Sequence, residues 1–310
     1  MSARILDGKA IAAAIESEVA SAVQDLEKRL GLTPRLCVVL VGENPASQVY
    51  VRNKARAAGR VGIRSEIIRL PETSCTADVR RQVEALDADS DVDGILVQLP
   101  LPRDVDEAEV MGRLDADKDV DGLTAVNMGR LLLGTNPWAP CTPAGVMEIL
   151  RRSDIPVEGK KVTIVGRSNI VGKPLALLML RAHATVTLCH TRTANLEEET
   201  RRADILVAAA GRTALLGARH ISPGTTVIDI GINRVTSRQE AENFFAGNPR
   251  RLEQFERNGS ALVGDVHPAE AQECAGAITP VPGGVGPLTV AMLLLNTVDA
   301  ARRRRTAARR

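Results

Sequence analysis

The stretch VTIVGRSNIVGKP, residues 162–174, decides the fold expected for the second half of the chain. The first four residues, three of them apolar and β-branched, predict a buried strand, Gly166 begins a turn, and Pro174 suits the first turn of a following helix. A strand, a glycine turn and a helix N-terminus can together cradle a phosphate, because the backbone approaches closely and its N–H groups favour negative charge. The spacing is not G-x-G-x-x-G, so these residues alone leave open a purely structural turn.

Strands and helices alternate on both sides of this stretch, which predicts parallel sheets. In the second half we expect strands at 162–165, 185–189, 205–209 and 226–230, with helices at 173–181 and 194–202. In the first half we expect strands at 36–41, 65–70 and 94–99, with helices at 8–30, 47–58 and 77–86. A proline-rich boundary at 135–144 separates the halves, and an apolar helix is expected at 288–301. The fold class is therefore α/β, with two α/β domains, the second resembling a Rossmann domain.

Composition narrows the class of protein. The 310 residues are 44% hydrophobic and 25% charged, and no run approaches the roughly 18 apolar residues of a membrane span. Charged residues interrupt the first 23 positions, so we expect no export signal and a cytoplasmic location. Five scattered cysteines predict neither disulfides nor zinc, and no spacing indicates another metal. Six of the last ten residues are arginine, which we interpret as a solvated helix end; binding to nucleic acid is the less favoured alternative.

The cofactor is predicted from the end of the second strand in the second half. There an NAD-binding chain usually places a carboxylate for the ribose 2′-hydroxyl, whereas this chain reads LCHTR at 188–192. Arg167, Thr191 and Arg192 offer donors that suit a 2′-phosphate instead, so we expect NADP. The alternative is that these arginines are ordinary surface residues.

The first half offers four candidate functional residues. Tyr50 and Lys54 are four apart and share one helix face. They could form an acid/base pair or an aromatic platform beside a cation, or they could simply lie on a surface helix whose lysine extends into solvent. Gln98 lies at the carboxyl end of a predicted strand, where α/β sheets bind ligands. Asp121, in the segment KDVDGL, has the local pattern of a turn and is not singled out by spacing.

Three strings in order carry a resemblance to a known family: VQLPLP at 97–102, GRSNIVGKP at 166–174 and ITPVPGGVGPLT at 278–289. The chain resembles the bifunctional methylenetetrahydrofolate dehydrogenase/methenyltetrahydrofolate cyclohydrolase family over nearly its whole length. This resemblance implies an N-terminal catalytic domain of residues 1–142 plus 285–310, and a Rossmann-type NADP-binding domain of residues 143–284. It also implies that the last helix returns to the first domain.

The family resemblance further implies two reactions, NADP-linked oxidation of 5,10-methylenetetrahydrofolate to the methenyl form and hydrolysis of that product to 10-formyltetrahydrofolate. Lys54 resembles the catalytic lysine, Gln98 its partner, Tyr50 the tyrosine beside the folate rings, and Asp121 the pterin anchor. The substrate would also meet Val97, Leu99, Pro282, Gly283 and Gly284. The cofactor would be held by Gly166, Arg167, Ser168, Ile170, Gly172, Thr191, Arg192 and Ile232. The family pattern implies a homodimer joined through the Rossmann domains and a role in one-carbon supply for purine, methionine and histidine synthesis.

The chain departs from the family pattern in two places. Residues 236–261 form a longer polar insert that contains all three phenylalanines, and it could pack on the Rossmann domain or contact a partner. His267 follows Gly264-Asp265-Val266, where the family has another residue type, and we expect it to serve local structure. Two other functions stay open at this point: a dehydrogenase with weak or absent cyclohydrolase activity, and a non-catalytic cofactor-binding regulatory protein.

Overall fold

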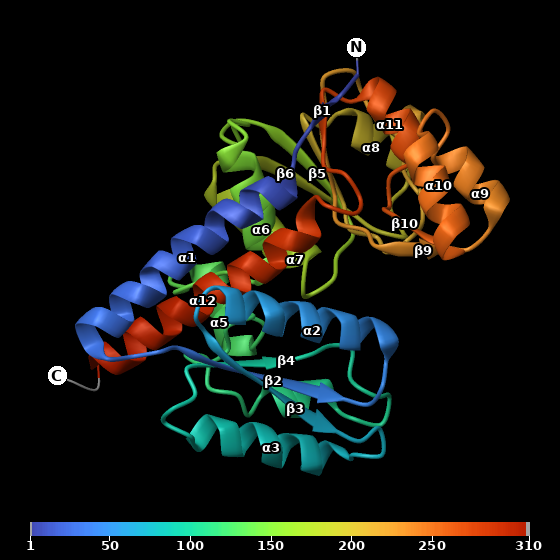
Figure 1. Ribbon diagram of the computed structural model, residues 1–310. Helices are drawn as coiled ribbons and strands as arrows, with labels where there is room; N and C mark the ends of the chain where they lie inside the picture. The colour runs from blue at the N-terminus through green and yellow to red at the C-terminus, as the bar shows by residue number, and fades with distance from the viewer. Residues whose placement is uncertain (1, 308–310) are drawn as a thin grey trace. The chain divides into compact units, whose positions relative to one another are not determined.

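The computed structural model describes residues 2–307, with side chains to residue 305, and forms two compact units (Figure 1). Unit 1 contains residues 2–11 and 142–288, and unit 2 contains residues 12–141 and 289–307. The expected first domain included residues 1–11, but residues 2–11 join unit 1 in the structure. The reason is that β1 (Arg4–Ile5) pairs in parallel with β11 (Ala277–Ile278).

A six-stranded parallel sheet forms the centre of unit 1, in the order β1-β11-β8-β7-β5-β6. Its further strands are β5 (Lys161–Val165), β6 (Thr185–Cys189), β7 (Ile205–Ala208) and β8 (Thr226–Asp229). The helical segments are α6 (Cys141–Arg152), α7 (Gly172–Arg181), α8 (Leu196–Arg201), η1 (Ala218–His220) and α11 (Pro268–Cys274). The apolar runs of β5, β7 and β8 are buried, as expected for strands covered on both faces. The predicted Rossmann-like strands are confirmed.

The insert forms a small layer of its own within unit 1. It contains α9 (Arg238–Phe244) and α10 (Pro249–Asn258), and the antiparallel strands β9 (Asn233–Val235) and β10 (Ala261–Val263) lie at its two ends. Phe245 and Phe255 meet Val235 and Val263 in one buried cluster, against which Phe244 and Leu252 also pack. Thus all three phenylalanines help to build the insert's own core.

Unit 2 is built on a three-stranded parallel sheet in the order β3-β2-β4. The strands are β2 (Arg35–Val41), β3 (Arg64–Leu70) and β4 (Gly94–Val97), and Figure 1 shows α2 (Pro45–Arg60) and α3 (Thr76–Ala88) on opposite sides of the sheet. Val79 and Val83 of α3 pack on Val39 of β2 in a fully buried cluster. β4 ends earlier than the predicted 94–99 strand, and Pro100 has no N–H with which to continue the ladder.

The remaining helices are α1 (Gly8–Leu30), α4 (Glu107–Met111), α5 (Ala125–Leu133) and α12 (Val285–Ala307). The sequence pattern missed α4, α5 and α6. Helix α6 starts inside the predicted proline-rich boundary, because Pro143 lies in its first turn, where no backbone N–H is needed. From residue 289 onward α12 belongs to unit 2, so the last helix does return to the first domain.

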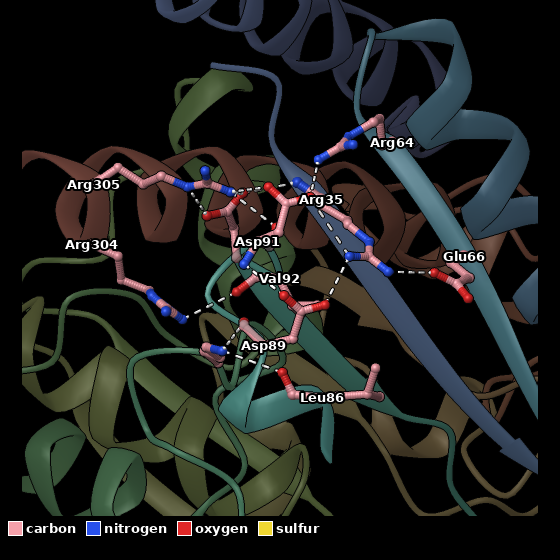
Figure 2. A network of polar contacts seen from close by, with 11 residues as sticks. Arg35, Arg64, Glu66, Leu86, Asp89, Asp91, Val92, Arg304 and Arg305 are labelled. Atoms are coloured by element: carbon pink, nitrogen blue, oxygen red, sulfur yellow. Dashed lines mark hydrogen bonds and ion pairs between the residues drawn. The ribbon is translucent and has the colours of Figure 1, made fainter. Parts of the chain in front are cut away.

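The end of α12 is held by a polar network that Figure 2 shows from close by. Arg305 donates from Nε to Oδ1 of Asp93 at 2.9 Å and from Nη2 to Oδ2 at 3.2 Å, and Arg304 donates to the Val92 carbonyl. The Asp93 side chain is fully buried. The interpretation of the basic run as a solvated helix end is therefore wrong for Arg305, although Arg302 and Arg303 are exposed. Arg309 and Arg310 lie outside the described residues.

Candidate active site

A lysine and a glutamine meet at the carboxyl end of β4 in unit 2. Lys54 is 9% exposed, and its Nζ donates a hydrogen bond of 3.0 Å to Oε1 of Gln98. The Gln98 side chain in turn donates from Nε2 to the Leu99 carbonyl at 2.6 Å, and its backbone N–H donates to Val39. The amide oxygen of Gln98 is thus fixed toward Lys54.

Tyr50 and Lys54 both lie on helix α2, whose first turn is fixed by a cap. Asn44 caps it by accepting from the backbone N–H groups of Ala46 and Ser47, and Pro45 occupies the first turn. Tyr50 lies one turn before Lys54 and is 40% exposed, and partial burial raises the pKa of its phenol. A half-exposed aromatic face one turn from a buried amine suits a flat ring ligand.

Asp121 lies on a loop that a different aspartate organises. The buried Asp119 carboxylate accepts from the N–H groups of Gly122 and Thr124 and from the side chain of Asn127. These bonds fold residues 119–127 into a tight turn, with Gly122 at φ +74°. Asp119 was not predicted as a functional residue, since its role depends on donors that only the folded loop brings together.

The carboxyl of Asp121 interacts with Lys54 and with Cys141. Burial raises the pKa of Asp121, whereas the charge of Lys54 and a hydrogen bond with the Cys141 thiol act in the opposite direction. Behind the loop, Asn296 donates to the Val120 carbonyl at 2.9 Å and to Cys141 Sγ at 3.6 Å. Lys54 therefore interacts with both Gln98 and Asp121, the three residues that the family resemblance assigns to one site. Cys141 and Asn296, which the sequence analysis did not select, support them.

Two predicted substrate residues flank Gln98. The Val97 side chain is 4% exposed and packs in the core, so only its backbone is available to a ligand. Leu99 is partly exposed and joined to Pro100 by a cis peptide bond.

The three other predicted substrate residues belong to unit 1. There the backbone N–H of Gly284 donates to the Pro280 carbonyl, and the backbone N–H of Lys9 donates to the Gly283 carbonyl at 3.1 Å. Gly283 has φ +112°, a value that favours glycine, while Pro282 is exposed.

The turn after β5 in unit 1 fits a dinucleotide. Gly166 has φ +131°, and a Cβ there would lie 2.0 Å from the Ala209 carbonyl oxygen. A Cβ on Gly172 would lie 2.0 Å from the oxygen of Gly166, so both positions require glycine. Ser168 Oγ accepts from the N–H groups of Val171 and Gly172, which shapes the turn at the start of α7. The backbone at this helix start can approach a pyrophosphate closely.

The other predicted cofactor residues have exposed side chains. They are Arg167, Ile170, Thr191, Arg192 and Ile232. No carboxylate stands between Cys189 and Arg192 after β6, and the Arg192 N–H donates to His190 Nδ1. The exposed donors of Arg167 and Arg192 fit an additional phosphate on the ribose.

Two buried aspartates position the loops at the carboxyl ends of β7 and β8. Asp265 accepts from the N–H groups of Ala210, Gly211 and Arg212. Asp229 accepts from the N–H groups of Gly231, in the loop after β8, and of Asp265 and Val266, which follow β10. Burial raises the pKa of Asp229 to about 7, against the effect of these bonds. Sequence reasoning missed both roles, although an aspartate that closes a buried strand is a usable signal.

His267 serves local structure, as expected. Its side chain caps α11 by accepting from the Glu270 N–H, and its ring makes an edge contact with Phe244 at a centroid distance of 5.3 Å.

Comparison with known proteins decides the family. The sequence model of the tetrahydrofolate dehydrogenase/cyclohydrolase catalytic domain matches residues 6–121, and that of the family's NAD(P)-binding domain matches residues 140–305. The chain belongs to the tetrahydrofolate dehydrogenase/cyclohydrolase family. It is therefore an enzyme with both an oxidoreductase and a hydrolase activity on tetrahydrofolate derivatives, and it carries the family's NAD(P)-binding domain.

Relatives of this tetrahydrofolate dehydrogenase/cyclohydrolase match along its whole length. The bifunctional protein FolD of Koribacter versatilis is 55% identical, over 98% of this chain and 99% of that protein. The crystal structure of the FolD methylenetetrahydrofolate dehydrogenase/cyclohydrolase from Campylobacter jejuni is 41% identical with a TM-score of 0.88, covering 98% of this chain and 100% of that one. A Trypanosoma brucei enzyme of the same kind, solved with NADP cofactor and an inhibitor, is 37% identical with a TM-score of 0.88, and 98% of each chain is covered.

Proposed function

We propose that this enzyme uses NADP to oxidise 5,10-methylenetetrahydrofolate to 5,10-methenyltetrahydrofolate, and then hydrolyses the product to 10-formyltetrahydrofolate. The observation that carries the assignment of the hydrolytic residues is the 3.0 Å hydrogen bond from Lys54 Nζ to Gln98 Oε1, beside Asp121. It gives unit 2 a buried amine whose position is fixed by an amide and which lies near a carboxylate.

In the hydrolytic step, Lys54 in its neutral form takes a proton from the water that attacks the methenyl carbon. The carbon–N5 bond of the resulting carbinol then breaks as the Lys54 ammonium returns the proton to N5. The carbinol hydroxyl releases its own proton to solvent, which leaves the formyl group on N10. Gln98 holds the amine in place for both transfers through Oε1, and its own Nε2 is fixed by the Leu99 carbonyl. The two bonds reduce the motions open to Lys54, which favours a reaction that depends on orientation.

Substrate binding in unit 2 follows from shape and charge. Asp121 accepts two parallel N–H groups from the amino-pyrimidinone edge of the pterin, and Tyr50 stacks on the ring system. The backbone of Val97 and Leu99 borders the rings. The family resemblance also assigns Pro282, Gly283 and Gly284 of unit 1 to substrate binding.

The cofactor is held by unit 1. Gly166, Ser168 and Gly172 form the turn that takes the pyrophosphate, while Ile170 and Ile232 offer apolar contacts. Arg167, Thr191 and Arg192 hold the 2′-phosphate, which explains the missing carboxylate after β6 and favours NADP over NAD. When bound, the nicotinamide accepts the hydride that leaves the one-carbon bridge of the substrate.

A paired assay tests the proposal. Wild-type enzyme should reduce NADP faster than NAD with methylenetetrahydrofolate, and it should accelerate the decay of methenyltetrahydrofolate. Lys54→Ala should lose at least a hundredfold in the hydrolytic rate, in line with the usual contribution of a general base, while keeping its circular dichroism spectrum. Unchanged hydrolysis in that variant would remove Lys54 from the mechanism. Absence of turnover in the wild type would leave a cofactor-binding protein without this activity.

We further infer a homodimer joined through unit 1, in the cytoplasm, that supplies one-carbon units for purine, methionine and histidine synthesis. Strand β6 supports the dimer, since it is the edge of the six-stranded sheet and its Val186, Thr187 and Leu188 are only partly buried. Among the described residues, no helix is long and apolar enough to cross a membrane. Sedimentation equilibrium measures the molecular mass of the wild type and of Val186→Lys in solution. A monomeric wild type contradicts the dimer.

A further inference from the structure

The insert contacts the substrate segment of unit 1 through one arginine. Arg251, on α10, donates from Nη1 to the Val281 carbonyl at 2.8 Å and from Nη2 to the Leu262 carbonyl at 2.5 Å. Its guanidinium also lies over the ring of Phe245, 4.4 Å from the centroid. A single side chain thus joins the insert's own core, strand β10 and the residue just before Pro282.

The Val281 carbonyl is one of several fixed points of the segment 280–284. Beyond it, the backbone N–H of Gly284 donates to the Pro280 carbonyl at 2.7 Å, and the backbone N–H of Lys9 donates to the Gly283 carbonyl at 3.1 Å. A Cβ on Gly8 would lie 1.8 Å from the Gly284 oxygen, so the start of α1 presses directly against this segment. Arg251 contacts this segment from the insert, and all of these contacts lie within unit 1.

If Arg251 served only to fill space, burying an arginine here would cost free energy for no gain. Its Nε is buried and has no hydrogen-bond partner among the described residues, which carries a desolvation cost. A methionine would fill the space against Phe245 without burying a polar atom. What only arginine supplies is a planar fork that reaches two carbonyls at once while its face lies on an aromatic ring.

We propose that Arg251 is a positioning residue for tetrahydrofolate binding: it holds Val281, and through it Pro282, Gly283 and Gly284, in the conformation that contacts the substrate. The insert 236–261 is then part of the substrate-binding machinery. This inference rests on the proposed function, since it takes residues 282–284 as folate contacts. Arg251 touches neither the pyrophosphate turn nor any residue of the Lys54 cluster in the contacts described above.

Three full-length variants test the proposal beside the wild type. Arg251→Met removes both donors but keeps apolar bulk, Arg251→Lys keeps one charged donor, and Arg250→Met changes the exposed neighbour on the same helix as a control. For each we would measure the KM for methylenetetrahydrofolate, the KM for NADP and kcat. Amide hydrogen exchange of a peptide covering 279–287, compared with one covering 161–189, reports the order of the segment without any need for turnover.

We expect Arg251→Met to raise the folate KM at least tenfold, about 1.4 kcal/mol, with the NADP KM and kcat within twofold. Exchange in 279–287 should become faster while exchange in 161–189 stays unchanged. Arg251→Lys should fall between wild type and Arg251→Met, with at least a threefold rise in folate KM, and Arg250→Met should behave as wild type. The Lys variant decides the matter alone if the Met variant does not fold.

An unchanged folate KM overturns the proposal, and so does an equal rise in both KM values with faster exchange throughout unit 1, because that pattern indicates general destabilisation. Wild-type enzyme without turnover would refute the proposed function itself. In that case the exchange of 279–287 still tests whether Arg251 holds the segment, and unchanged exchange in Arg251→Met would refute the hold as well.

Discussion

Removal of Arg305 should destabilise unit 2 far more than the position of this residue near the end of the chain suggests. The Asp93 carboxylate, with no exposed surface, accepts two bonds from Arg305 and a third from the Arg35 N–H at 3.0 Å. In Arg305→Ala only the third donor remains. Breaking a buried ion pair from one side usually costs about 3–5 kcal/mol. Because the Arg305 side chain is 29% exposed, its removal opens a path for water to the carboxylate, and we expect a loss at the low end, about 3 kcal/mol.

Thermal unfolding followed by circular dichroism or calorimetry measures this loss. For a unit of this size, about 3 kcal/mol corresponds to a fall in Tm of roughly 6–12 °C. The matched control is Arg302→Ala on the same helix, whose ion pair with Asp299 is exposed on both sides and should be worth less than about 1 kcal/mol.

A double-mutant cycle separates the pair from other effects of the substitution. Asp93→Asn removes the buried charge, so adding Arg305→Ala to it should cost at least about 1.5 kcal/mol less than in the wild type. If Arg305→Ala changes the free energy of unfolding no more than Arg302→Ala does, the network in Figure 2 does not stabilise α12 and the reasoning is wrong.

Three further predictions follow from the sites. Burial raises the pKa of Asp121, and pterin binding needs its ionised form, so the folate KM should rise as pH falls through that raised pKa. Asp121→Asn should give a high folate KM at every pH. A flat pH profile of the folate KM in the wild type would contradict this role of Asp121. Asp119→Ala should disorder the loop of Asp121. The emission of Trp138, the single tryptophan, should then shift to the red, because its Nε1 donates to the backbone carbonyl of Asp119 in that loop. Unshifted fluorescence with an unchanged folate KM would count against this loop organisation. Asp265→Asn should raise the Kd for NADP about tenfold or more in a fluorescence titration, since its carboxylate orders residues 210–212; equal affinities would show that these loops are not needed for the cofactor.

Local patterns were enough to predict the four central strands of the Rossmann-like part and the position of Gln98. Buried parallel strands are continuous apolar runs, and the end of such a run marks the edge where ligands bind. The glycine turn at Gly166 was likewise visible, because a helix start directly after a strand constrains the residues between them. Lys54 was a candidate by its helical spacing from Tyr50, but only the resemblance gave it a role.

Other parts of the site depend on contacts between distant positions and could not be predicted from local pattern. Asp119 and Asp121 occupy similar turn contexts, yet one is buried and accepts from three donors while the other interacts with Lys54. Asp265 binds N–H groups more than fifty residues away in sequence. Arg251 is thirty residues from Val281, and nothing near either residue indicates the contact. In each case the partner is defined only once the chain has folded.

The division of the chain between its units has a consequence for synthesis on the ribosome. Strand β1 can pair only after β11 has been made, and the three-stranded sheet of unit 2 lacks Asn296 and Arg305 until the last residues have left the exit tunnel. The first half of the chain is therefore translated early, but unit 2 reaches its full set of contacts only at the end of synthesis. A nascent chain that stalls after residue 280 would hold the strands of unit 2 without α12 and without the cation that pairs with Asp93, and chaperones and proteases recognise such incomplete chains.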